Sequence, residues 1–246
     1  VSSLAPTVFA LTDSADEALR HEAIKQAGAL AGTTEWPRLL DKLTSATNDA
    51  DRAAWLGAAE AAAIRLSRAS VELTRRWKSA ETPTAREALL ALIGRLRPPD
   101  LLPAVAQAAS SAQPNERHAA IRALSRWADA AALPPLIAAA RHPEAATRRL
   151  AQRGLVQVLR EAAQLRPAER VAHAAEIAVV IEHADEQKAL LAILADAATA
   201  EAAAVAARFL DQPAVRAEAE LAILRSARAA GAANRPPVRA ALERIA

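Results

Sequence analysis

Arginine and glutamine side chains recur between residues 143 and 164 at spacings that place them on one face of a helix. At roughly 100° per residue they fall within about 80° of one another, and no acid shares that sector, although Glu161 borders it. A guanidinium presents a planar fork of N–H groups, so such a face suits carboxylates, phosphates or sugar hydroxyls. The alternative is a solvated helix face. The candidate binding residues are Arg149, Arg153, Arg160, Gln157 and Gln164.

A second cluster combines two carboxylates with an imidazole. Glu169, His173 and Glu176 share a helix face, and such a set can hold a metal or move protons. The spacing matches no established ligand motif, and these residue types are ordinary on exposed helices. The chain has no cysteine, and no GxSxG, GxGxxG, P-loop or HExxH motif. We therefore expect no metal, no cofactor and no catalytic residue, and predict that the protein is not an enzyme.

The tryptophans offer a third kind of chemistry, because indole rings can stack on sugars or bases. Trp36 and Trp127 flank expected turns, where we expect them to seal the ends of helix pairs. Trp55 and Trp77 are left open, and Trp77 lies among Arg75, Arg76 and Lys78. The chain has four tryptophans, two phenylalanines and no tyrosine, so it offers few aromatic side chains on which bases could stack. We do not expect a nucleic-acid partner; direct carbohydrate binding needs at least one exposed tryptophan.

Helix pairs must position these side chains. The stretch from Asn115 to Pro143 predicts two short helices: the first has apolar residues on one stripe, and the second opens with Pro134 and Pro135, which are tolerated in a first turn. A unit this small cannot bury both stripes alone. Similar units recur with a period of about 32–33 residues, a range typical of stacked helix pairs. We predict one domain over residues 1–246, with a capping or truncated helix at 1–11 and repeats at 13–46, 49–80, 82–111, 114–141, 143–183, 185–212 and 213–246.

Composition supports the same architecture. Alanine is the commonest of the 246 residues, glycine occurs six times, and aromatic residues make up 2 %, which favours closely packed helices over sheets. We predict an all-α fold, a right-handed α–α superhelix of about six to seven helix pairs. The net charge is only +3, with acids in excess over residues 1–60 and bases in excess over 141–170. No apolar run is long enough for a membrane span. Because the chain has no methionine, we expect a processed form or a piece of a longer protein.

Units such as NERHAAIRALSRWADAAALPPLIAAA, with a charged start, an Ala-Ile pair and a Leu-Pro turn, resemble HEAT repeats. The segments TRRLAQRGLVQVL and EQKALLAILADAATAEAAAVAARFL resemble a bacterial HEAT-repeat module. That module occurs beside extracytoplasmic carbohydrate-active domains, including 3-keto-disaccharide hydrolase-like ones, and beside cytochrome-bearing dehydrogenases. Where the module often has an aromatic residue, this chain has Leu155. The resemblance implies a HEAT-like solenoid, and a periplasmic location is suggested by it alone.

These observations favour a non-catalytic protein–protein interaction or scaffolding module, part of a larger bacterial protein. Its second helices are expected to line a concave surface for a protein partner or a neighbouring domain. Arg149, Arg153 and Arg160 are the expected polar anchor. The alternative is a nucleic-acid-binding or DNA-repair HEAT-like protein. A small-molecule ligand is left open.

Overall fold

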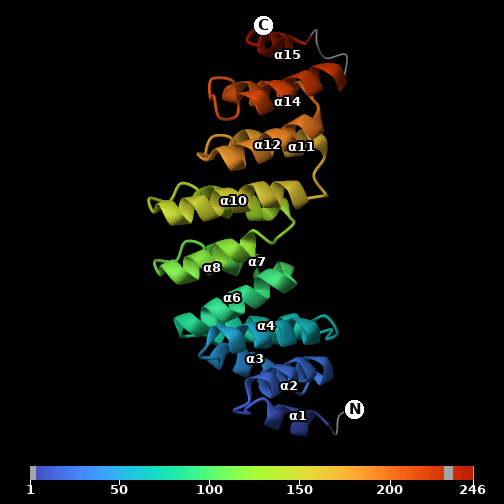
Figure 1. Cartoon of the computed structure of the whole chain (residues 1–246), viewed down its shortest axis with the longest axis vertical. Helices are drawn as coiled ribbons and strands as arrows, with labels where there is room; N and C mark the ends of the chain where they lie inside the picture. Colours follow the sequence, from blue (N-terminus) through green and yellow to red (C-terminus); the bar gives the residue numbers. More distant parts are fainter. Residues whose placement is uncertain (1–3, 230–234, 246) are drawn as a thin grey trace. The chain divides into compact units, whose positions relative to one another are not determined.

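The fold consists of α-helices, and no strand occurs in residues 4–229 and 235–245, which the computed structural model describes (Figure 1). The all-α prediction is therefore confirmed. The α-helices are α1 (Ala5–Leu11), α2 (Glu17–Leu30), α3 (Trp36–Ser45), α4 (Asp49–Ala63), α5 (Ala69–Ser79), α6 (Pro83–Leu96), α7 (Leu102–Ala108), α8 (Pro114–Leu124), α9 (Leu133–Ala139), α10 (Ala145–Glu161), α11 (Pro167–Ile177), α12 (Ala184–Ala197), α13 (Ala200–Ala206), α14 (Arg216–Ala229) and α15 (Pro236–Glu243). Short 3-10 turns η1 (Pro99–Leu101), η2 (Ala130–Ala132) and η3 (Ala207–Phe209) lie beside α7, α9 and α13.

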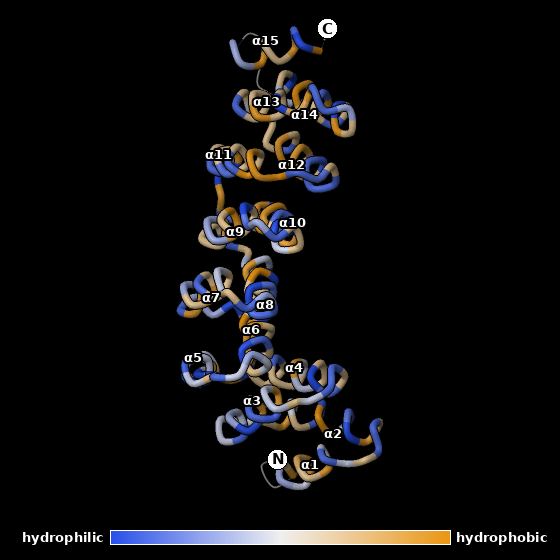
Figure 2. Tube along the Cα trace, turned by 90° about the vertical axis from the view of Figure 1, so that its left-hand side faces the viewer, coloured by the Kyte–Doolittle hydropathy of each residue, from blue (hydrophilic) through white to orange (hydrophobic). Residues whose placement is uncertain are grey.

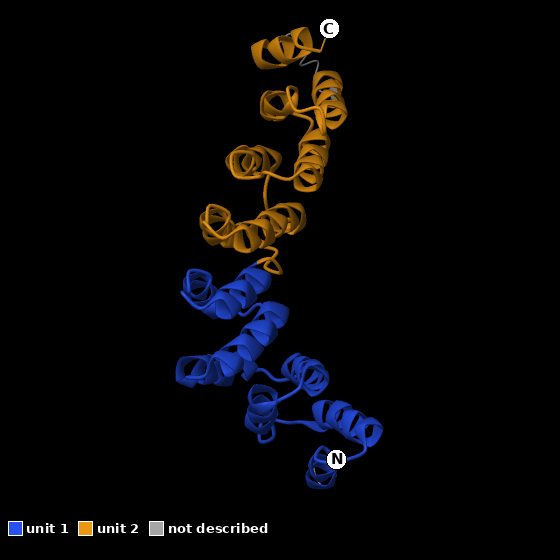
Figure 3. Ribbon diagram, turned by 60° about the vertical axis from the view of Figure 1, so that its left-hand side comes forward, with its two compact units in different colours: residues 1–124 blue, residues 125–246 orange. Residues whose placement is uncertain are grey.

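The contacts divide the chain into two compact units, residues 1–124 and 125–246 (Figure 3). In unit 1, the first helices of successive pairs pack in the order α2, α4, α6 and α8, and α3 packs against α4 and α6. In unit 2, α10, α12 and α14 pack in the same way, and the second helices α11, α13 and α15 follow one another. The single domain over residues 1–246 and the right-handed superhelix both stay predictions.

Helix starts follow from capping chemistry. The side chains of Asp16, Asn48, Thr82 and Thr199 accept hydrogen bonds from backbone N–H groups of the first turns of α2, α4, α6 and α13. Prolines occupy first turns where no intrahelical N–H bond is lost, as at Pro83. Each helix then mixes hydrophobic and hydrophilic residues along its length (Figure 2), so that apolar side chains are buried between neighbours.

Small residues set the spacing between first helices. A Cβ added at Gly28 would lie 2.6 Å from the Cα of Ala58, and one added at Gly94 would lie 2.7 Å from the Cα of Ala123. Each pair joins consecutive first helices, α2 with α4 and α6 with α8. No side chain can occupy these positions without pushing the backbones apart. The packing through small residues that the composition predicts is therefore present.

An arginine clamp closes the turn that leads into each of five first helices. The guanidinium Nη1 or Nη2 donates to the carbonyl six residues earlier, at 2.8–3.5 Å. Two of these arginines also reach a carboxylate on the next first helix, since Arg20 Nε is 3.1 Å from Asp51 Oδ1 and Arg86 Nε is 2.5 Å from Glu116 Oε1. The clamps satisfy turn carbonyls, and the two carboxylate contacts also join neighbouring repeats laterally. Its members are Arg20, Arg52, Arg86, Arg117 and Arg148.

Candidate interaction surface

The predicted arginine face lies on α10, the first helix of its pair. Arg149, Arg153, Gln157 and Arg160 are all exposed there. Arg153 Nε lies 3.1 Å from Glu186 Oε1, yet 59 % of the Arg153 side chain stays exposed, whereas Glu186 is buried. Gln157 Nε2 donates to Glu161 Oε1 at 3.2 Å. The structure thus brings four of the five predicted residues onto one exposed surface. One of the three arginines, Arg153, already forms an ion pair with Glu186.

The prediction that places the fifth residue, Gln164, on that helix is wrong. α10 ends at Glu161, and Gln164 lies in the turn that follows. The guanidinium of Arg170, from α11, donates to the carbonyl of Leu159 and, at 2.7 Å, to that of Ala162. These bonds satisfy carbonyls at the end of α10, where Ala162, with ψ 76°, leaves the helical conformation. The second helix of this repeat, α11, ends at Ile177, before the end of the predicted repeat at residue 183.

The carboxylate–imidazole cluster is used locally. Glu169 accepts hydrogen bonds from the Arg166 side chain and from its backbone N–H at 2.9 Å, and these bonds lower the pKa of Glu169 to about 2. Glu169 thus caps the start of α11. His173 Nδ1 is 3.7 Å from Glu176 Oε2. In the described part of the chain no group of three or more potential ligands could hold a metal ion.

All four tryptophans are buried, with exposed fractions of 3–6 %. Trp36 Nε1 donates to the carbonyl of Ala69 at 3.3 Å, which ties α3 to the start of α5. The guanidinium of Arg86 lies over the Trp77 ring at 4.3 Å from its centroid, so the basic residues beside Trp77 do not frame a stacking platform. The structural role expected for Trp36 and Trp127 extends to Trp55 and Trp77, and no tryptophan is available to a sugar or base.

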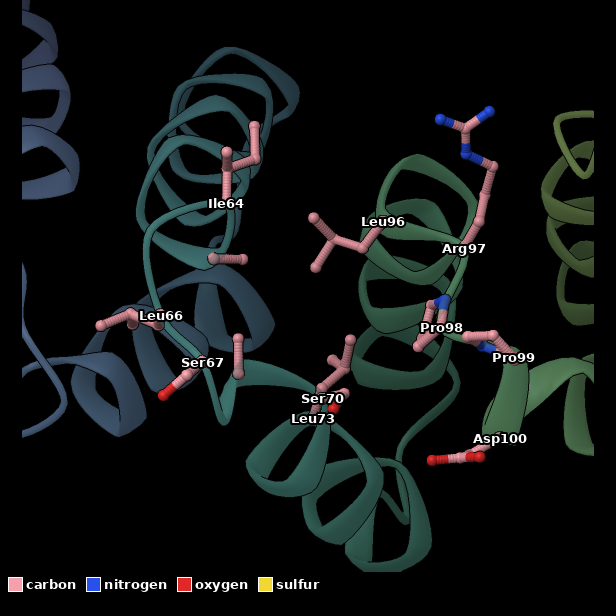
Figure 4. A pocket seen from close by; sticks show the side chains of 12 residues that line it. Ile64, Leu66, Ser67, Ser70, Leu73, Leu96, Arg97, Pro98, Pro99 and Asp100 are labelled. Atoms are coloured by element: carbon pink, nitrogen blue, oxygen red, sulfur yellow. The ribbon is translucent and has the colours of Figure 1, made fainter.

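Unit 1 contains a pocket of about 340 Å³ among the end of α4, the start of α5 and the end of α6 (Figure 4). Ile64, which is 76 % exposed, and Leu96 border its apolar opening. Arg97 has a left-handed backbone, with φ 51°, and its side chain extends away from the pocket (Figure 4). Asp100 completes the polar border, so the charged groups there are of both signs.

Unit 2 contains a larger open groove between two second helices, α9 and α11. Its apolar part has a volume of about 600 Å³ and is lined by Pro134, Ile137, Ala138, Arg141, Ala175, Glu176 and Val179. Val179, which lines the groove, is 71 % exposed, and this is a high exposed fraction for an aliphatic side chain. The groove continues into a second part of about 350 Å³, which shares Arg141 and Val179 with the first. We call the two parts together the α9–α11 groove.

The second part of the groove is rich in hydrogen-bond donors. Arg141 is exposed, and within residues 4–229 and 235–245 its guanidinium has neither a hydrogen bond nor an ion pair. His142 Nδ1 accepts the N–H of Glu144 at 3.1 Å, so the neutral ring carries its proton on Nε2 and is a donor there. Arg148 Nη1 donates to the carbonyls of His142 and Pro143, and its Nε lies 3.4 Å from Glu182 Oε1 without forming a hydrogen bond.

This groove was not predicted from the sequence. The pattern around His142 indicates only a turn residue with a surface role, and it does not single out Arg141. The segment Arg141-His142-Pro143 does contain a usable signal: two side chains with hydrogen-bond donors precede a proline that restricts the backbone of the turn between two repeats. The opposite wall includes Val179 and Glu182, some forty residues later, and only the folded arrangement of unit 2 brings these residues to the same groove.

The helices that the structure describes are each too short or too polar to cross a bilayer.

Comparison with known families adds one finding. Residues 71–156, from α5 into α10, match the model of the family described as HEAT repeats. No curated protein matches the chain significantly. HEAT repeats commonly mediate protein interactions or scaffolding and are typically non-catalytic. The stacked helix pairs of each unit agree with that match, which supports a HEAT-repeat module over residues 71–156.

Proposed function

We propose that this protein is a non-catalytic protein–protein interaction or scaffolding module, and that its partner docks on unit 2. The observation that carries the proposal is the α9–α11 groove, an open apolar surface that ends in unsatisfied hydrogen-bond donors. Second helices held by stacked neighbours form such a surface before any partner arrives, so little ordering entropy is lost on binding. The exposed Val179 and the donors of Arg141 supply the apolar and polar contacts that interfaces combine.

The chemistry of the remaining polar groups supports a binding role rather than catalysis. Glu169 is held ionised by Arg166, with a pKa of about 2, so it is a poor proton donor or acceptor near neutral pH. Buried Glu186 is paired with Arg153. Both groups hold helices in place, and neither borders the α9–α11 groove.

We propose a second contact on the arginine face of α10. Arg149 and Arg160 are exposed and their side chains form no ion pair within the described residues, and Arg153 retains an exposed guanidinium beside Glu186. Arginine forks bind carboxylates in two-point contacts, so this face suits an acidic region of the partner. It remains the proposed polar anchor, without Gln164. We further propose, from the resemblance alone, that the partner is a neighbouring domain or protein of a larger bacterial assembly.

Site-specific photo-crosslinking tests the docking surface. Val179 is replaced by p-benzoylphenylalanine in the whole chain, expressed in its source cells, and crosslinked proteins are identified by mass spectrometry. Leu224, which is 51 % exposed on α14, carries the same probe as the matched control. We expect one protein to crosslink at position 179 and not at 224. The purified partner should then bind the native chain and lose affinity for Val179→Asp but not for Leu224→Asp.

Charge reversal tests the arginine face separately. Circular dichroism first confirms that a variant carrying Arg149→Glu, Arg153→Glu and Arg160→Glu is as helical as the native chain. Binding of the purified partner should weaken in this variant. Equal crosslinking at positions 179 and 224, or recovery only of nuclease-sensitive material that salt removes, would contradict docking of a protein on unit 2.

A further inference from the structure

The α9–α11 groove has a chemical direction. Toward its centre Ile137 and Val179 provide aliphatic surface, and toward the turn between α9 and α10 the lining becomes Arg141, His142 and Arg148. Three side chains there have donors that no group in the described residues uses: the Arg141 guanidinium, His142 Nε2 and Arg148 Nη2. An anionic group is the natural occupant of such a cluster.

The opposite wall limits where that anion can lie. Glu176 belongs to the α11 side of the apolar part, with 62 % of its side chain exposed, and Glu182 lies near Arg148. A second carboxylate beside Glu176 would be repelled, whereas one beside Arg141 would be attracted. The groove therefore accepts an apolar group and an acid in a fixed order along its length.

The backbone shows which kind of carboxylate fits. Chain-terminal carboxylates are captured by free backbone N–H groups. The residues that line the polar end already have acceptors for their backbone N–H groups: those of Ala140, Arg141, His142, Arg148, Val179 and Val180 bond to backbone carbonyls, and that of Glu182 bonds to Gln152 Oε1. The donors that these lining residues leave available are all on side chains. This favours an aspartate or glutamate side chain within a segment over a chain end.

We propose that the α9–α11 groove recognises an acidic–apolar linear segment of a protein partner. An aliphatic side chain of the segment occupies the space between Ile137 and Val179, and an aspartate or glutamate a residue or two away bonds to Arg141, His142 and Arg148. This recognition rests on the proposed function, because it specifies the chemistry of the partner that docks on unit 2. It adds a sequence rule that a general docking surface does not have.

A phage-display library of random linear peptides, selected on the whole chain, tests the rule and needs no identified partner. Selection is repeated on Arg141→Glu, Val179→Asp and Arg126→Glu. Arg126 is an exposed arginine of unit 2 that does not line the groove, so it controls for the change of charge. We expect the native chain and Arg126→Glu to enrich an aliphatic residue followed closely by an acid, and the other two variants to lose that enrichment.

Synthetic forms of the best peptide identify the group that binds. Fluorescence anisotropy compares the acidic peptide with its glutamine or asparagine counterpart, and a free C-terminus with an amidated one. A hydrogen-bonded charge is worth enough that its removal should weaken binding about tenfold or more, whereas amidation should leave affinity unchanged. A peptide with lysine in place of the acid should bind Arg141→Glu better than it binds the native chain.

The outcomes separate this rule from the proposed function. Peptides that lack an acid, or whose binding depends on Val179 but not on Arg141, would overturn the acidic rule and leave protein docking in the groove intact. Loss of binding on amidation would show that the side-chain donors bind a C-terminal carboxylate, and it would also overturn the rule that they bind an acidic side chain. So would displacement of the peptides by single-stranded DNA. If the library yields no enriched motif while position 179 still crosslinks a protein, recognition of a linear segment is overturned, whereas docking of a protein on unit 2 stands.

Discussion

Two glycines of unit 1 should respond in opposite directions to the same substitution. Gly28, in α2, faces α4 so closely that an added Cβ would lie 2.6 Å from the Cα, 2.7 Å from the carbonyl oxygen and 2.8 Å from the Cβ of Ala58. Gly57, in α4, has no heavy atom within 4 Å of the added Cβ. Both lie inside helices, where alanine is favoured over glycine by about 1 kcal/mol. Their difference therefore isolates the cost of the close approach.

The magnitude follows from the geometry. Ordinary contact begins at 3.4 Å, so Gly28→Ala must separate the two helices locally by about 0.8 Å, and backbone atoms cannot rotate aside. Overpacking of this kind costs about 3 kcal/mol, at the upper end of its usual range. After the helix preference is subtracted, Gly28→Ala should destabilise by about 2 kcal/mol, whereas Gly57→Ala should stabilise by about 1 kcal/mol.

Urea unfolding followed by circular dichroism measures both variants against the native chain. Hydrogen exchange with mass spectrometry then shows whether the loss in Gly28→Ala is concentrated in α2 and α4, which pack directly on each other. Equal effects of the two substitutions, or stabilisation by Gly28→Ala, would refute the reasoning, because the space between α2 and α4 would then admit a methyl group.

Three further outcomes are expected. Arg65→Ala should destabilise by about 1–2 kcal/mol in urea unfolding, because its guanidinium bonds to three carbonyls at the end of α2, whereas exposed Arg68→Ala should change little. The pKa of Glu169 is lowered in the folded chain from 4.5 to about 2, so its contribution to stability is present above pH 4.5 and is lost as pH falls toward 2. Urea unfolding measured across that range should show the stability of the native chain approaching that of Glu169→Gln at the acid end. A stability difference between the two chains that does not change with pH would contradict the pairing of Glu169 with Arg166. Iodide should quench the four tryptophans several-fold less in the folded chain than in urea, and equal quenching would contradict their burial.

The arrangement of helices was predictable because local signals act within each repeat. Helical stripes, the prolines of first turns and the repeat period all depend on residues a few positions apart. Helix lengths were less predictable. α10 ends at Glu161, and Arg170, from the next helix, bonds to the carbonyls of Leu159 and Ala162 there; the residues of α10 alone do not predict this contact.

The candidate site was predicted in part. The α10 face follows from helical geometry, so four exposed residues could be named, but their neighbour Glu186 lies thirty-three residues beyond Arg153 and its pairing needs the stacked helices. The α9–α11 groove lies between second helices of different pairs, and no periodicity within one helix reveals it. The burial of Trp55 and Trp77 could not be predicted from the sequence either, because a tryptophan beside arginines can be buried or exposed.

The arginine clamp has a consequence for how such chains can lengthen. Positions 20, 52, 86, 117 and 148 stand 31 to 34 residues apart, and each clamp lies wholly within the segment that it closes, six residues from donor to acceptor. A duplicated or deleted segment of one period therefore brings or removes its own closure, and the turns on either side keep theirs. Gene duplication can add helix pairs to a chain of this kind without a compensating change elsewhere, and an array assembled from identical copies would inherit a closed turn at every junction.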